Sequence, residues 1–469
     1  MVRTSLASAN RYLLFIVIAV GAVPLDPSDI VLAECTIQAS TQVSVETASQ
    51  LCALQSLALP LNRVDDYAPL IKKAGHAQFV LLGDATHGTH EFYEERIKIS
   101  KRLIQEKQFT LIGIEGDWAN VQLLNQAIHA TDSITPIQAL NSFVEWPDWI
   151  WKNQEMLDFL QWLVEHNSRM VGRTRKVHLF GMDLYNFNRS QQLVRDYLKK
   201  VSREVGSLAE RRYECFSRFQ HNLHRYAAAI EKAPALSCEQ AVTQQYIDFI
   251  DCRIPCPDET DVRTHEIFFQ AQLNALTIKN AEKYFRILYQ TDGDVMSWNA
   301  RDRHMLESIT AMQEHLGHPK TLLWAHSSHL GDAAATDRAD LGELNLGQLL
   351  RAQYPNQVYS IGLVTYAGQV LASDDYYGPG QMKTLLPAQP ESYSALFHQL
   401  GLPRFLLFLQ DPLAVPKWLN GPRLQRHIGA VYRHDNERNV HYNYTRLVDQ
   451  FDAIVHIDNT TPLVMVSEN

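Results

Sequence analysis

The feature that most constrains the fold is a short apolar run that ends in ionisable side chains. Residues Phe79–Leu82 are apolar, Gly83 interrupts them, and a polar turn and an amphipathic helix follow. A buried strand, a turn and a helix in this order are typical of an open α/β sheet, which carries its chemistry at the carboxyl ends of its strands. The turn after Gly83 is therefore a candidate for part of a functional site.

The same pattern recurs and predicts a sheet. Phe109–Glu115, Lys176–Asp183 and Thr321–His326 are apolar runs that also end in an ionisable side chain. Helical spacing of apolar residues across Glu91–Gln108 returns the chain to the same edge. Further predicted strands are Gln357–Val364, Phe405–Leu409, Ile428–Tyr432 and Ala453–Ile457. We predict an α/β fold with a mostly parallel sheet, helices on both faces and a large helical insertion.

Two stretches of the chain differ in pattern from the predicted sheet. Amphipathic helical patterns replace strands over about 190–315, which predicts an insertion and a candidate lid inside a catalytic domain of residues 36–469. Residues 1–35 contain an apolar run of about a dozen residues, the size of a signal-peptide core and too short for a membrane span. Export or a periplasmic location follows if that segment is a signal peptide, and a cytoplasmic location follows if it is an apolar helix of the domain.

The amino-acid composition and charge limit the kinds of binding partner that this chain can have. The net charge of -9 and the pI near 6.1 argue against nucleic acid, because phosphate binding needs clustered Lys and Arg. Six cysteines are too sparse for a disulfide scaffold, and Cys252 and Cys256 lack the neighbours of a zinc site. A local bridge between these two is expected in an exported protein, and thiols in a cytosolic one. No stable membrane span is expected.

Histidine beside carboxylates and arginine is the constellation best suited to catalysis. His87 can take a proton from water if a carboxylate holds its other nitrogen, and Asp84 or Glu115 could be that partner. Arg96 keeps its charge and could orient a carboxylate or stabilise an oxyanion. His326 and His329, three residues apart, form a second cluster. Because burying so many ionisable groups without purpose is costly, we interpret them as one site.

Several motifs together resemble a known family. They are Gly83–Gly88, Ile114–Trp118, Phe180–Tyr185, Ser297–Met305, Trp324–Asp332, Asn345–Gln348, Ile428–Tyr432 and Gln450–Ala453. In this order they resemble the erythromycin esterase family over about residues 64–463.

The resemblance implies an α/β fold and ester hydrolysis by histidine-activated water, with no required metal or other cofactor. The best-known members open the macrolactone ring of erythromycin-type antibiotics. The family's essential histidine falls on His87, its arginine on Arg96, its glutamate on Glu115 and its later histidine pair on His326 and His329. The substrate-binding residues predicted from the motifs are Trp118, Asp183, Trp298 and Arg301.

The chain departs from the family near the centre of the motifs. Asp84 replaces the usual glutamate, one methylene longer, and Ser327 stands where an asparagine is common. No serine or cysteine lies in a nucleophile-elbow context, so no acyl-enzyme is expected.

The sequence therefore predicts a hydrolase acting on a small-molecule carboxylic ester, with a macrolide lactone among the candidates. Its proposed mechanism has His87 activate water, Asp84 and Glu115 stabilise the imidazolium, and Arg96 with His326 or His329 steady the intermediate. Two alternatives stay open. The repeated His-x-x-His spacing would suit a metal-dependent hydrolase, and the same site could hold a haem, a metal or a hydrophobic ligand without catalysis.

Overall fold

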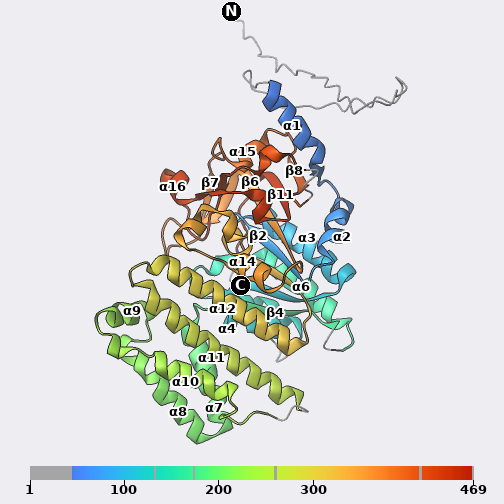
Figure 1. Cartoon of the computed structure of the whole chain (residues 1–469). Coiled ribbons are helices and arrows are strands. Elements are labelled where there is room, and N and C mark those ends of the chain that lie inside the picture. The colour runs from blue at the N-terminus through green and yellow to red at the C-terminus, as the bar shows by residue number, and fades with distance from the viewer. Residues whose placement is uncertain (1–44, 131–133, 173–174, 258–260, 411–414, 467–469) are drawn as a thin grey trace, which may run out of the picture.

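The computed structural model describes residues 45–130, 134–172, 175–257, 261–410 and 415–466 (Figure 1). The segment predicted as a signal peptide, residues 1–35, lies outside these ranges. Among the described residues, no helix is both long enough and apolar enough to cross a bilayer.

The core of the molecule is a mixed, mostly parallel sheet. Within the described ranges it has nine strands, eight of them in the order β1-β8-β11-β6-β2-β5-β3-β4, and β7 pairs with β6. The strands are β1 (Leu59–Pro60), β2 (Phe79–Asp84), β3 (Phe109–Asp117), β4 (His178–Asp183), β5 (Lys320–His326), β6 (Val358–Ala372), β7 (Gln381–Leu385), β8 (Arg404–Phe408) and β11 (Ala453–Thr460). A separate hairpin pairs β9 (Arg423–Arg426) with β10 (Tyr442–Thr445).

Helices account for most of the remaining chain. They are α1 (Val45–Leu57), α2 (Ala68–Ala74), α3 (His90–Lys107), α4 (Trp118–Ile128), α5 (Pro136–Leu140), α6 (Gln154–Ser168), α7 (Phe187–Val201), α8 (Arg203–Tyr213), α9 (Leu223–Lys232), α10 (Glu239–Ile250), α11 (Val262–Leu288), α12 (Gly293–Leu316), α13 (Ser327–Leu330), α14 (Leu346–Gln353), α15 (Tyr393–His398), α16 (Glu437–Val440) and α17 (Leu447–Gln450).

Two apolar layers enclose the sheet. Val80 and Leu82 of β2 face a core shared with α3 and α6, whereas Phe79 and Leu81 face a core shared with α11, α12 and α14. Alternate side chains of one buried strand thus pack on opposite faces, which explains why its sequence is a continuous apolar run. The predicted fold class, an α/β sheet with helices on both faces, is confirmed.

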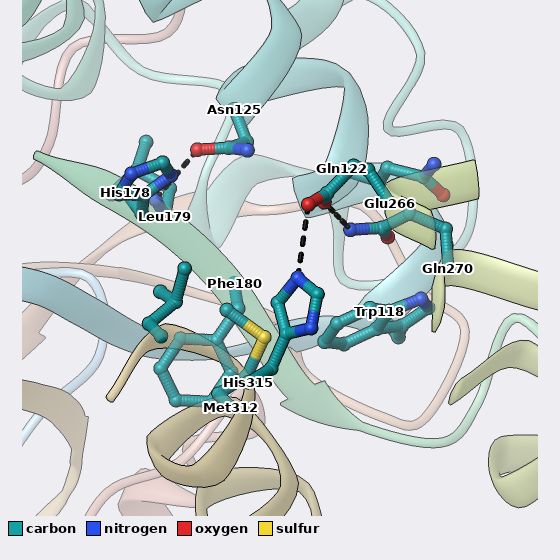
Figure 2. Close-up of a pocket in the computed structure, with 11 residues that line it drawn as sticks. Trp118, Gln122, Asn125, His178, Leu179, Phe180, Glu266, Gln270, Met312 and His315 are labelled. Carbon is teal, nitrogen blue, oxygen red and sulfur yellow. Dashed lines mark hydrogen bonds and ion pairs between the residues drawn. The ribbon is translucent and has the colours of Figure 1, made fainter. Parts of the chain in front are cut away.

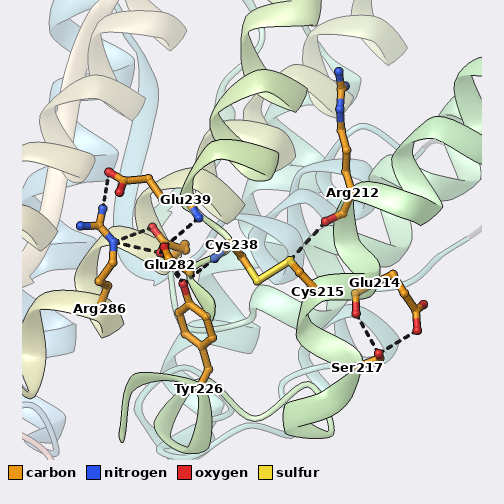
Figure 3. Close-up of a disulfide and its surroundings, with 10 residues drawn as sticks. Arg212, Glu214, Cys215, Ser217, Tyr226, Cys238, Glu239, Glu282 and Arg286 are labelled. Carbon is orange, nitrogen blue, oxygen red and sulfur yellow. Dashed lines mark hydrogen bonds and ion pairs between the residues drawn. A yellow bond between two sulfur atoms is a disulfide. The ribbon is translucent and has the colours of Figure 1, made fainter. Parts of the chain in front are cut away.

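Helices α7 to α11 have a core of their own beside the sheet (Figure 1). Phe187 and Val194 of α7 pack there with Tyr226 of α9 and Ile278 of α11. A disulfide joins Cys215 to Cys238 next to the hydrogen-bonded pair of Tyr226 and Glu282 (Figure 3). These helices and α12 occupy the stretch predicted as an insertion, and the domain boundaries stay a prediction.

Smaller elements differ from the sequence prediction. The predicted strand Ile428–Tyr432 is wrong, because the segment makes only isolated bridges, to Thr86 and to Ser373. The hairpin of β9 and β10 and the short strands β1 and β7 were not predicted. The bridge between Cys252 and Cys256, expected for an exported protein, is present.

Two neighbouring strands are held at the candidate site by a close backbone approach. Ile114 of β3 pairs with Gly181 of β4, and a bulge then brings Asp117 opposite Asp183. A Cβ on Gly181 would lie 2.4 Å from the carbonyl oxygen of Gly116. The bulge therefore depends on a glycine at position 181, which has no side chain to collide with the Gly116 carbonyl.

We expect Gly181→Ala to lower the free energy of unfolding by about 1–3 kcal/mol, the usual cost of overpacking. Urea denaturation would measure it. Gly421→Ala is the matched control, because a Cβ there has its nearest neighbour at 3.9 Å. Equal midpoints for the two variants would contradict the prediction.

Candidate active site

Four strands that lie next to one another in the sheet carry ionisable side chains at or near their carboxyl ends. In the order of the sheet these are Asp84 on β2, His326 on β5, Glu115 on β3 and Asp183 on β4. The strands are parallel, so their carboxyl ends meet at one edge. The strand-end residues predicted from the sequence are therefore brought together.

His87 lies between two of these carboxylates. The turn after β2 is fixed by backbone hydrogen bonds, from Ile428 N–H to the Ala85 carbonyl and from His87 N–H to the Ile428 carbonyl. The Nδ1 atom of His87 lies 3.4 Å from Asp84 Oδ1, and Nε2 lies 3.9 Å from Glu115 Oε2. The second distance is too long for a hydrogen bond. Nε2 can therefore accept a proton from a water molecule.

Arg96 lies behind Asp84 rather than at the edge of the sheet. Its side chain is 1% exposed, with Nη1 2.6 Å from Asp84 Oδ2. The same guanidinium donates to the Leu82 and Ala325 carbonyls at the ends of β2 and β5. Burial opposes the charge on Asp84, but Arg96 and His87 outweigh it and lower the pKa of this carboxyl. Arg96 thus keeps Asp84 ionised, and its predicted contact with the intermediate is not supported by this placement.

Arg301 of α12 joins three groups of the site. Its Nε and Nη2 donate to Asp183 at 3.0 and 2.5 Å, and Nη2 also reaches Glu115 at 2.8 Å. Its Nη1 lies 2.8 Å from His329 Nε2. Burial opposes the charge on Glu115, but His329, His87 and Arg301 hold its pKa well below the usual value. Glu115 is therefore an anion beside His87.

His329 is held from both sides. Its Nδ1 lies 2.9 Å from Asp302 Oδ2, and its ring stacks on Trp298 with 4.3 Å between ring centroids. Burial opposes its charge, but Asp302 and Glu115 raise the pKa of His329 to about 9. The ring is therefore protonated at neutral pH, and its Nε2–H can donate to Glu115, 3.3 Å away.

His326 has the opposite electrostatics. Burial and the neighbouring His87 lower the pKa of His326 to about 3, so its ring is neutral. The Ser328 backbone N–H donates to its Nδ1, which places the proton on Nε2. Among the described residues Nε2 has no hydrogen-bond partner. The rings of His326 and His87 lie 4.9 Å apart, so an unused N–H is available beside the predicted base.

The chain is similar in sequence and in fold to known proteins. The erythromycin esterase family model matches residues 104–460, more than half of the chain. The chain belongs to the erythromycin esterase family. Erythromycin esterase type II of Escherichia coli is 20% identical over 340 residues, which are 67% of this chain and 75% of that protein.

Two solved structures share the fold. A protein named for succinoglycan biosynthesis has a TM-score of 0.72 at 22% identity, covering 91% of this chain and all of its own. A mutant of the erythromycin esterase EreC, in its open conformation, has a TM-score of 0.63 at 16% identity, covering 87% of this chain and 96% of its own. These likenesses establish the fold shared with an erythromycin esterase.

The residues predicted to bind substrate separate into two groups. Asp183, Arg301 and Trp298 lie in the cluster described above. Trp118 does not, because it is 3% exposed and packs edge-on against Phe269 of α11. It lines a small pocket between α4, β4, α11 and α12, where His315 contacts Glu266 (Figure 2).

Some members of the cluster were missed in the sequence. Asp302 follows Arg301 directly and holds His329, while His427 lies next to His326 with 5.8 Å between ring centroids. Both lie in or beside motifs of the erythromycin esterase family, so the motif positions were a signal for them. Asp117, the last residue of β3 and part of the motif Ile114–Trp118, was also left without a role. Within the described ranges, no set of three or more His, Cys, Asp or Glu is grouped to hold a metal ion.

We expect Arg96→Met to destabilise this esterase-family fold by about 3–5 kcal/mol at neutral pH, because it leaves the Asp84 carboxylate buried without a cation. The loss should shrink as the pH falls, since the variant's Asp84, whose pKa is no longer lowered, regains stability on binding a proton. Denaturant unfolding at pH 7 and pH 5 would measure both effects.

Arg102→Met on the same helix is the matched control. Arg102 pairs with Glu106 near the surface at 2.6 Å, so its loss should cost less than about 1 kcal/mol. Similar losses for the two variants, or a loss from Arg96→Met that ignores pH, would contradict the role given to Arg96.

Proposed function

We propose that this member of the erythromycin esterase family hydrolyses carboxylic esters with water activated by His87. The observation that supports it is the position of His87, whose imidazole lies between Asp84 at 3.4 Å and Glu115 at 3.9 Å. Both carboxylates have lowered pKa values and are anions at neutral pH. They favour the imidazolium that forms when His87 takes a proton.

The two nitrogens of His87 have different tasks in this mechanism. Nδ1–H points to Asp84, which orients the ring, and Nε2 receives the proton of the attacking water. The hydroxide oxygen attacks the ester carbonyl carbon and gives a tetrahedral intermediate. Glu115 stays in place because Arg301 and the His326 backbone N–H bind its two oxygens, at 2.8 and 2.7 Å.

The oxyanion of the intermediate is assigned to His326. Its neutral Nε2–H is a buried donor without a hydrogen-bond partner among the described residues, it lies beside His87, and it costs no rearrangement to use. Ser328 Oγ lies 2.7 Å from His326 Nδ1, which superficially resembles a serine–histidine pair. Because the pKa of His326 is about 3, this ring is a poor base, and we assign no acyl-enzyme to Ser328.

The first substrate to test is a macrolide lactone. The family and the E. coli relative, named erythromycin esterase type II, support this choice. Exposed aromatic side chains of Tyr376 and Tyr377 pack on Trp146, and Tyr377 bonds His224 of the helical region at 2.8 Å. These rings offer contact area to a large apolar ester.

We expect the purified protein to hydrolyse at least one member of a panel of macrolides and simple esters, with ring opening or cleavage measured by mass. His87→Ala should lower the rate by about 10²–10⁴-fold, the usual contribution of a general base. Circular dichroism should show an unchanged fold.

His76→Ala is the control, because His76 is an exposed histidine just before β2. Full activity in His87→Ala, or equal losses in the two variants, would refute the assignment. Activity that a chelator abolishes and a metal restores would favour a metal-dependent hydrolase instead.

His326→Phe should lower kcat by about 10²–10³-fold with little change in KM, because it removes one oxyanion donor and keeps a ring in place. His326→Gln can still donate a hydrogen bond and should retain more activity than His326→Phe. Steady-state kinetics on one ester would compare them. Equal kcat values for the two variants would contradict a donor role.

A further inference from the structure

The bulge in β3 gives Asp117 a special position. Without it Gly116 would face Asp183, but the extra residue between Ile114 and Asp117 brings Asp117 directly opposite Asp183. Neighbouring strands lie about 4.8 Å apart, so Asp117 and Asp183 are adjacent across the two strands and the charge of Asp183 acts on Asp117. Bulges beside active sites commonly re-aim one side chain in this way.

Arg301, the cation at this edge of the sheet, forms its ion pairs with residues other than Asp117. Arg301 donates to Asp183, to Glu115 and toward His329, and among the described residues no Lys, Arg or His forms an ion pair with Asp117. Asp117 is held by backbone amides: its Oδ1 accepts the Asn186 N–H at 2.9 Å, and the Tyr185 amide also lowers its pKa. Asp117 is also the residue before α4, yet its side chain does not cap that helix.

The charges around Asp117 favour its acid form. Burial and Asp183 raise the pKa of Asp117 to about 7, and the backbone amides of Asn186 and Tyr185 with Arg301 offset this only in part. The neighbouring Glu115 stays ionised, because its pKa is held well below the usual value. One edge of the sheet thus holds a base, an anion and a carboxyl group that can bind a proton near neutral pH, which is how acid and base roles are divided in many hydrolases.

Resting on the esterase function proposed above, we propose that Asp117 is the general acid that protonates the leaving alcohol oxygen, and that the substrates are esters of poor leaving groups such as alkyl esters and lactones. His87 removes a proton from water as its oxygen bonds to the acyl carbon. When the acyl carbon–oxygen bond breaks, the Asp117 proton passes to the departing oxygen. His87 then releases its proton to solvent, Asp117 takes one up, and the products are the acid and the alcohol.

A structural role for Asp117 must be separated from this one. Its contact with the Asn186 amide connects β3 to the loop before α7, where Asn186 also bonds Asn120 of α4 at 2.7 Å. Asp117→Asn keeps an oxygen acceptor for that amide but cannot transfer a proton. The variant therefore removes the acid and preserves the contact.

The experiment compares two esters of one acid, an alkyl ester and a p-nitrophenyl ester, with wild type, Asp117→Asn and Asp435→Asn. A p-nitrophenolate leaves without a proton, whereas an alkoxide needs one. We expect Asp117→Asn to lower kcat on the alkyl ester by about 10²-fold or more and on the p-nitrophenyl ester by less than about threefold. Asp435→Asn, an exposed acid, should match wild type on both.

The pH profile supplies a second readout. Because wild-type Asp117 loses its proton as the pH rises through about 7, the ratio of wild-type to Asp117→Asn rates on the alkyl ester should fall between pH 6 and pH 9. Equal losses on both esters, no loss on the alkyl ester, or a ratio independent of pH would overturn the proton-donor role. A wild-type protein that cleaves neither ester would refute the esterase function itself.

Discussion

The buried guanidinium of Arg301 is the interaction on which the arrangement of the site depends. It reaches from α12 to Asp183 on β4 and to Glu115 on β3. Two strand ends and one helix are therefore held by one cation. Removing a single partner from such a buried set leaves a charge without compensation, which costs several kcal/mol. The geometry around His87 thus follows from how α12 packs on the sheet.

Two arginines divide the carboxylates between them, and this division sets the chemistry. Arg96 keeps Asp84 ionised from one face of the sheet, and His329 and His87 together with Arg301 keep Glu115 ionised. His326 lies between these anions, but burial keeps it neutral. Asp117 is left with backbone donors, and its pKa rises. Neighbouring side chains at one edge of the sheet therefore hold different protonation states.

The strand ends of the site were predictable because a buried parallel strand has a local signature. Continuous apolar runs that stop at Asp84, Glu115, Asp183 and His326 are visible in one sequence. These apolar runs could not show the register in which neighbouring strands pair. The bulge that turns Asp117 toward Asp183 depends on pairing between strands far apart in the chain. The burial of Arg96 was missed for a similar reason, since its partners Leu82 and Ala325 come from two different strands. Ile428–Tyr432 has a strand composition, but it crosses the end of β2 and makes only single bridges.

The helices of the region predicted as a lid differ in how they meet the site. Helix α12 carries Arg301 and Asp302, so displacing it would separate Arg301 from Glu115 and Asp183 and dismantle the site. Helices α7 to α10 instead pack on α11 through their own core. Their contact with the sheet side includes the bond between His224 of α9 and Tyr377 in the segment between β6 and β7. An exposed bond of this kind is weak compared with the buried pairs of Arg301. Any opening that admits substrate is therefore expected at the His224–Tyr377 contact, while α12 stays packed on the sheet and keeps Arg301 in place.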